Sequence, residues 1–150
     1  MKLELKNIAP YLPYGLKMKH YENNRIGNLQ GVSTNTLGQP YSLCVNTNWY
    51  NSFVYKPILR PLSDLTKEIE VNGIKFKPSE YIDLNFIGFE MYVDDEISFD
   101  YSYSDCRGEI SNTFELNDVV SIYNKLLEWH FDVFGLIEQK LAIDINTLEL

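Results

Sequence analysis

The sequence predicts an α+β fold, in which a mostly antiparallel sheet packs around one long C-terminal helix and short helices lie in the connections. Three observations support this. Residues 118–134 have the periodicity of a helix, several shorter segments alternate between apolar and polar side chains as strands do, and turn residues separate these segments. At 150 residues the chain is expected to form a single domain, residues 1–150.

The long helix is predicted from about residue 118 to residue 134, with Gly135 as its end. At about 100° per residue, one face collects mainly apolar side chains: Val119, Val120, Tyr123, Leu126, Leu127, His130, Phe131 and Phe134. This arc covers roughly 200°, wider than the ~100° stripe of a surface helix. We therefore expect the helix to be covered on more than one side.

Strands are predicted from alternation or short apolar runs, with turn residues between them, at 16–21, 25–32, 41–45, 86–93, 98–104 and 141–146. Residues 46–52 are interpreted as a loop, and 78–82 as a short helix with proline in its first turn. Two structures remain open for residues 63–77. One is a hairpin closed by Asn72 and Gly73, which pairs Val71 with Ile74. The other is a helix over 63–71 that Gly73 ends.

Charge and composition exclude several classes of protein. Residues 1–62 carry seven basic and two acidic residues, whereas residues 63–150 carry six basic and nineteen acidic residues, for a net charge of -8. A sequence pI of about 4.7 argues against a general nucleic-acid binder, because attraction to phosphates normally needs a basic domain. No apolar run approaches the ~20 residues of a membrane span, and the N-terminal residues lack the apolar core of a signal peptide. A cytoplasmic protein with no membrane partner is expected.

No metal site, cofactor or catalytic motif is predicted. The two cysteines, Cys44 and Cys106, lack zinc spacing, and the chain has no phosphate-binding glycine loop and no nucleophile motif. The acidic residues between 90 and 109 do not match a calcium loop, because Phe99 stands where the loop needs glycine. Cys106 and His130 do not form a triad with Asp132, which falls on the opposite side of the predicted helix from the histidine.

Four residues are candidates for binding. His130 lies on the apolar arc of the helix, where a histidine must satisfy its ring nitrogens and is most often bonded structurally to a backbone carbonyl or a carboxylate. Arg60 lies between Leu59 and Pro61, where a permanent charge needs an anionic partner. Tyr101 and Tyr103 alternate with polar residues, as in a stacking platform for a sugar, although ordinary packing is the simpler interpretation.

Four stretches resemble a family of small proteins encoded in phages and prophages of Bacteroidetes. They are LKNIAPYLPYGL (5–16), KPILRPLSDLTKEI (56–69), EWHFDVFGLI (128–137) and LAIDIN (141–146), together almost a third of the chain. The family has no established activity, so the resemblance implies a genomic setting and assigns no catalytic residue.

The leading hypothesis is a non-enzymatic accessory protein of a phage or prophage that binds a phage or host protein. Its surface would combine the acidic 90–109 region with exposed aromatic residues. The first alternative is a small-molecule or sugar-binding domain that uses Arg60, His130, Tyr101 and Tyr103. The second is an acid-base enzyme that uses His130, which requires an accessible imidazole.

Overall fold

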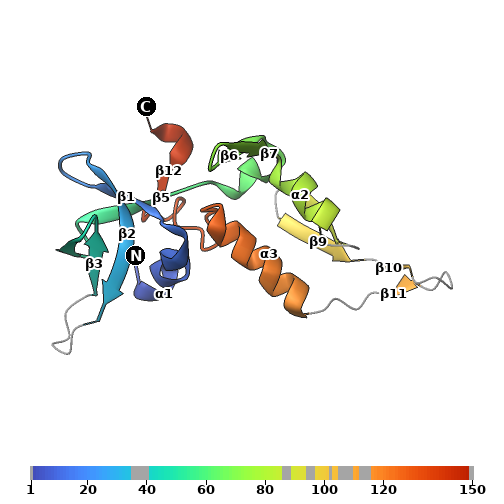
Figure 1. Ribbon diagram of the computed structural model, residues 1–150, viewed down its shortest axis with the longest axis horizontal. Coiled ribbons are helices and arrows are strands. Elements are labelled where there is room, and N and C mark those ends of the chain that lie inside the picture. The colour runs from blue at the N-terminus through green and yellow to red at the C-terminus, as the bar shows by residue number, and fades with distance from the viewer. Residues whose placement is uncertain are drawn as a thin grey trace. The chain divides into compact units, whose positions relative to one another are not determined.

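The computed structural model describes residues 2–34, 41–85, 89–93, 97–101, 103–104, 110–111 and 116–148, with side chains outside 86–115. The described chain has the predicted α+β fold, with mostly antiparallel strands, a longer helix near the C-terminus and short helices (Figure 1). It divides into two compact units. Unit 1 combines Met1–Pro61 with Leu126–Leu150, and unit 2 is Leu62–Lys125, so unit 2 is an insertion in the sequence of unit 1.

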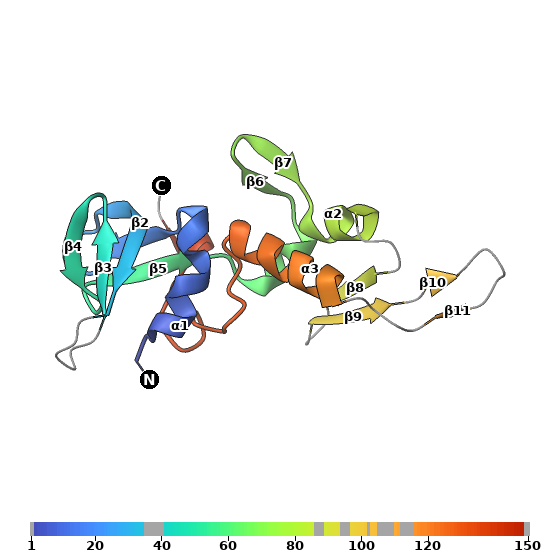
Figure 2. The same cartoon turned by 60° about the horizontal axis from the view of Figure 1, so that its bottom comes forward.

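Within the described residues, unit 1 is built on a six-stranded sheet of order β12-β5-β1-β2-β3-β4. The strands are β1 (Lys17–His20), β2 (Ile26–Ser33), β3 (Ser42–Val45), β4 (Asn48–Asn51), β5 (Tyr55–Leu59) and β12 (Ile143–Asp144). Strands β1 to β4 form an antiparallel meander, in which Figure 2 shows β2, β3 and β4 side by side. Strand β5 returns antiparallel to β1, and β12 adds parallel to β5. The predicted C-terminal strand therefore joins the sheet and makes it mixed.

The interpretation of 46–52 as a loop was wrong, because this stretch contains β4. Asn46 and Thr47 form a two-residue turn with positive φ angles of 47° and 70°, and they place Val45 opposite Asn48. Turns of this kind usually carry glycine at the second position. Here side chains of β2 and of the turn itself hold it: Thr47 N donates to Gln30 Oε1 at 2.6 Å, and Asn28 N donates to Asn46 Oδ1 at 2.9 Å.

The core of unit 1 lies between the inner face of the sheet and segments from both ends of the chain. Two short helices near the N-terminus, α1 (Leu5–Ile8) and η1 (Ala9–Tyr14), contribute Ile8 and Tyr11, and the C-terminal part contributes Leu127, Leu136 and Ala142. Pro10 lies in the first turn of η1, where proline is tolerated, whereas Pro13 lies inside it and has no amide hydrogen to donate, which disfavours an α-helix there. A third short helix, η3 (Ile145–Thr147), follows β12.

In unit 2 the structure describes short helices and short paired strands. They are η2 (Leu62–Thr66), β6 (Ile69–Val71), β7 (Ile74–Phe76), α2 (Pro78–Asn85), β8 (Phe89–Val93), β9 (Ile97–Tyr101), β10 (Tyr103–Ser104) and β11 (Ile110–Ser111). The hairpin predicted within 63–77 is confirmed, with Val71 opposite Ile74 and positive φ angles at Asn72 and Gly73. Of the alternative helix over 63–71, only the short 3-10 helix η2 is present. The Asn72–Gly73 turn favours strand pairing over continuation of a helix.

The long helix, α3 (Leu116–Glu128), ends six residues before the predicted end. His130 adopts the left-handed conformation with φ of 59°. The backbone N–H of His130 donates to Leu127 O at 3.0 Å, and that of Phe131 donates to Leu126 O at 2.9 Å. This is the Schellman arrangement that normally ends a helix at glycine. His130 takes the position that the sequence analysis gave to Gly135.

Part of the face of α3 that was predicted to be buried is exposed. Val119, Val120 and Tyr123 are 38–47% exposed, whereas Ile122 and Leu126 are buried. The face was placed with the help of residues 130–134, which are not helical, so its centre was rotated away from the buried side. Leu127 belongs to the core of unit 1. Packing of the sheet around the remainder of the helix stays a prediction.

Candidate functional site

Two of the predicted site residues, Arg60 and His130, meet through their backbones. Arg60 N donates to His130 O at 2.8 Å, and Asp132 N donates to Arg60 O at 2.8 Å. These bonds form a parallel bridge between Arg60 and Phe131, just beyond the end of β5. The structure therefore brings the two residues together as part of the framework of unit 1.

The ring of His130 is bonded to a backbone carbonyl, as in the structural interpretation of this residue. Its Nε2 lies 2.9 Å from Tyr14 O, and because a carbonyl only accepts, Nε2 carries the hydrogen. Burial lowers the pKa of His130, the bond to Tyr14 acts in the opposite direction, and the positive charges of Arg60 and Lys17 lower the pKa further. A neutral imidazole with one nitrogen already bonded is suited to holding η1 against the end of α3.

The other two predicted binding residues are Tyr101, which ends β9, and Tyr103, which begins β10. Their side chains lie outside the described residues. The same holds for Cys106 and for the acidic side chains between 90 and 109. Among the side chains that are described, no three of histidine, cysteine, aspartate or glutamate gather in a way that could hold a metal ion.

Asp132 does not lie on a helix as predicted, but in the turn that follows α3. It is 5% exposed, and its carboxylate accepts from Leu136 N and from Ile137 N, each at 2.8 Å. Both carboxylate oxygens are therefore used to organise the chain that leads to β12. This geometry gives Asp132 a structural role.

Trp49 was not singled out from the sequence. It is the most exposed large apolar side chain on the described strands of unit 1. Trp49 lies in β4, the edge strand of the described sheet, and is 58% exposed. A Cβ atom built on Gly31 of β2 would lie 3.5 Å from Trp49 Cη2, so the indole extends across β3 as far as β2. Cys44 of β3 lies opposite Trp49. The indole is therefore supported by the sheet and still open to solvent.

No described strand pairs with the outer side of β4, where backbone groups of Trp49 lie. The two-residue turn at Asn46 and Thr47 makes Val45 and Asn48 the closing hydrogen-bonded pair of the hairpin. Hydrogen-bonded and non-hydrogen-bonded pairs alternate along antiparallel strands, so the next pair, Cys44 with Trp49, is not hydrogen-bonded. The N–H and C=O groups of Trp49 consequently point away from β3. An exposed side chain and an unpaired edge coincide at one residue.

Charge is distributed differently between the units than between the two halves of the sequence. Unit 1 contains eight basic and seven acidic residues, for a net charge of +1, because it includes five acids from the C-terminal part. Unit 2 contains five basic and fourteen acidic residues, for a net charge of -9. Unit 1 is therefore close to neutral in net charge, and the net negative charge of the chain belongs to unit 2.

Comparison with known proteins found no matching family model, no similar curated protein and no similar solved structure. No helix in the described parts of the chain is both long enough and apolar enough to span a membrane.

Proposed function

We propose that this chain is a non-enzymatic protein-binding module, an accessory protein of a phage or prophage that acts in the cytoplasm of the host. Trp49 carries the proposal. An exposed and preorganised indole is the kind of residue that dominates the binding energy of protein interfaces, because it contributes a large apolar area at a small cost in side-chain entropy. The phage setting rests on the sequence resemblance alone.

The geometry supports binding by strand addition. An edge strand with unpaired N–H and C=O groups is a template on which an extended segment of another protein can pair. In β4 these groups belong to Trp49 and, by the same alternation, to Asn51, whose carbonyl already accepts from Val54 N at 3.1 Å. The partner is therefore an extended segment with an apolar side chain that contacts the indole. This mode of binding does not use the acidic 90–109 region, which was part of the surface predicted from the sequence.

Two substitutions separate the side chain from the backbone. Trp49→Ala removes the indole and leaves the edge intact. Asn51→Pro removes an outward-pointing N–H and keeps the indole, since proline is tolerated at edge positions that do not donate to the neighbouring strand. Tyr21→Ala is the matched control, because Tyr21 is 69% exposed in the turn after β1 and lies outside β4.

The test is capture from lysate of infected host cells, followed by an affinity measurement with the purified partner. We expect Trp49→Ala and Asn51→Pro each to weaken binding at least tenfold, about 1.4 kcal/mol, and Tyr21→Ala to bind as the unchanged protein does. A partner that binds equally well to the Trp49→Ala protein would contradict the proposal. Circular dichroism of each variant confirms that the loss does not come from unfolding.

A further inference from the structure

A cavity of about 180 Å³ opens on unit 1, and neither Arg60 nor His130 is among its lining residues. Three segments of the chain contribute to it: the N-terminal residues before α1, the turn between β4 and β5 with the start of β5, and the segment before β12. Its lining residues are Lys2, Leu3, Ser52, Phe53, Tyr55, Lys56 and Leu141.

The lining combines apolar walls with positive charge. Leu3, Phe53 and Leu141 supply apolar surface, and the two ionised side chains of the lining are Lys2 and Lys56, with no carboxylate among the lining residues. Lys56 Nζ donates to Lys140 O at 2.9 Å, which fixes the position of the ammonium group. An ammonium has three N–H donors, so two remain for a ligand.

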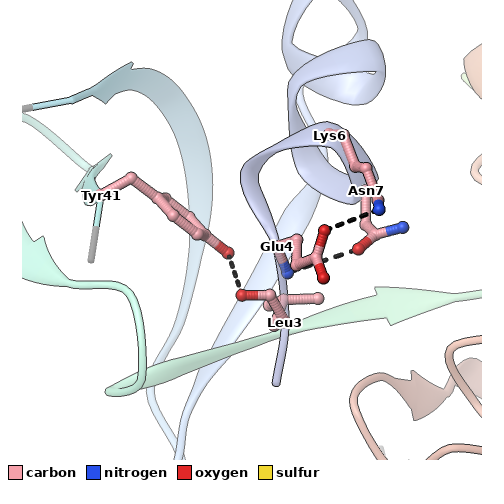
Figure 3. A network of polar contacts seen from close by, with 5 residues as sticks. All are labelled: Leu3, Glu4, Lys6, Asn7 and Tyr41. Carbon is pink, nitrogen blue, oxygen red and sulfur yellow. Dashed lines mark hydrogen bonds and ion pairs between the residues drawn. The ribbon is translucent and has the colours of Figure 1, made fainter. Parts of the chain in front are cut away.

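The walls are held in place by hydrogen bonds outside the cavity. Tyr41 Oη donates to Leu3 O at 3.2 Å, and Glu4 N donates to Asn7 Oδ1 at 3.3 Å (Figure 3). Burial, with the negative charge of Glu4 as a second cause, raises the pKa of Tyr41 to about 12, so this donor stays protonated at neutral pH. These bonds hold the Leu3 side of the cavity in place.

Two lysine side chains lie opposite each other beside the cavity. Lys19 of β1 lies directly opposite Lys56 of β5, and like charges in such a cross-strand pair repel each other. Within the described part of the chain, Lys2, Lys19 and Lys56 make no ion pair with a carboxylate. An anion bound beside Lys56 would relieve this repulsion. Phe53, which is 67% exposed, stands where it can cover the apolar part of such a ligand.

We propose that this cavity binds a small carboxylate that carries an apolar group. The carboxylate accepts hydrogen bonds from Lys56 and Lys2, and the apolar group contacts Leu3, Phe53 and Leu141. The volume is below the ~300–1,000 Å³ of pockets that hold drug-sized ligands, so the bound group is correspondingly small. Either a free carboxylic acid or the C-terminal residue of an apolar peptide offers this chemistry.

The test is a titration of the full-length protein followed by amide chemical shifts in NMR. The probes are hexanoate, its neutral counterpart hexanamide, acetate, and the dipeptide acetyl-Leu-Leu with a free or an amidated C-terminus. We expect saturable shifts at residues 52–56 and 141 with hexanoate, and at least tenfold weaker binding of hexanamide and of acetate. Tighter binding of the free dipeptide acid than of hexanoate assigns the site to peptide C-termini, and the reverse order assigns it to free acids.

Lys56→Gln and Lys19→Gln form a matched pair, because both remove one exposed charge from opposite positions of adjacent strands and only Lys56 lines the cavity. We expect Lys56→Gln to weaken hexanoate binding about tenfold, and Lys19→Gln, which removes only the repulsion that the bound anion relieves, to weaken it about twofold. Phe53→Ala should weaken hexanoate more than acetate. The proposal is overturned if hexanoate gives no saturable shifts, if hexanamide binds equally well, or if the two lysine variants behave alike.

Discussion

The hydroxyl group of Tyr11 donates a hydrogen bond to the backbone carbonyl of Phe131 across 2.6 Å, and neither residue is exposed to solvent. The two residues are 120 positions apart in the sequence. Removing the hydroxyl leaves Phe131 O with the backbone N–H of Val133, at 2.9 Å, as a remaining donor. We therefore expect Tyr11→Phe to lower the free energy of unfolding by about 0.5–1.5 kcal/mol, the net value of one hydrogen bond. Urea denaturation measures this difference.

Tyr14→Phe is the matched control for Tyr11→Phe. Tyr14 uses its backbone carbonyl, not its hydroxyl, in the bond to His130, and its side chain is half-buried. We expect this variant to stay within about 0.5 kcal/mol of the unchanged protein. Equal losses in the free energy of unfolding for the two variants would mean that the hydrogen bond from the Tyr11 hydroxyl to Phe131 O does not stabilise the fold.

A substitution at Thr47, in the turn before β4, should stabilise the protein. Thr47 is β-branched and has φ of 70°, a conformation that is strained for such a residue and free of strain for glycine. Thr47→Gly keeps the backbone N–H that Gln30 accepts. We expect thermal unfolding to show a gain of about 0.5–1 kcal/mol. Asn46→Gly should not stabilise, because it removes the acceptor for Asn28 N, and a gain there instead of at Thr47 would refute this account.

Two glycines of β2 should differ sharply in their tolerance of alanine. A Cβ on Gly27 would lie 2.5 Å from Cγ1 of the buried Val45, whereas the nearest atom to a Cβ on Gly31 is Cys44 Cβ at 3.4 Å, an ordinary contact. We expect Gly27→Ala to destabilise unit 1 by about 1–3 kcal/mol in chemical denaturation, and Gly31→Ala by less than about 0.5 kcal/mol. Similar values for both would show that the strands separate easily at Gly27.

The stability of the protein should depend on pH through His130. Its folded pKa lies below the ordinary value of 6.5, so between the two pKa values the unfolded chain binds more protons than the folded chain. The stabilising contribution is therefore fully present above pH 6.5 and is lost as the pH falls through the folded pKa.

The variant His130→Asn tests this dependence, because asparagine tolerates the left-handed conformation and does not titrate. We expect its free energy of unfolding to fall less than that of the unchanged protein between about pH 7.5 and 5.5. Above pH 7.5 the two proteins should change in parallel. An identical loss of stability in both on acidification would rule out His130 as the cause.

The bridge between Arg60 and Phe131 brings together the two points of unit 1 between which unit 2 is inserted. We therefore expect unit 1 to fold when residues 63–125 are replaced by a flexible linker of about eight residues. Differential scanning calorimetry should show one cooperative transition. A second chain that lacks only 63–115 keeps α3 and controls for loss of that helix. If neither chain unfolds cooperatively, the single domain expected from chain length is the better description.

Local chemistry determined which features could be predicted from sequence. The hairpin at Asn72 and Gly73 was one of two structures left open for residues 63–77, and its register was given correctly, because the turn type and the pairing of Val71 with Ile74 depend only on nearby residues. The turn at Asn46 and Thr47 was missed, because it lacks glycine and is held by the side chain of Gln30 on another strand. The end of α3 was misplaced for a similar reason, since a histidine took the position at which glycine is usual.

The candidate site was harder to predict than the fold. Arg60 and His130 were singled out by their apolar surroundings, and the structure joins them through backbone bonds that no sequence pattern reveals. Trp49 gave no signal, because the position of its indole over Gly31 follows from the pairing of three strands. Lys2 and Lys56 likewise meet at one cavity only after distant segments have come together.

The parallel pairing of β12 with β5 has a consequence for how the protein is made. The partner of Ile58 is Ile143, so the ribosome must add 85 further residues before that side of β5 can be covered. At about 5–20 residues per second this takes roughly 4–17 s. During synthesis the nascent chain thus carries an incomplete sheet, in which this side of β5 stays uncovered until the segment around Ile143 has been made.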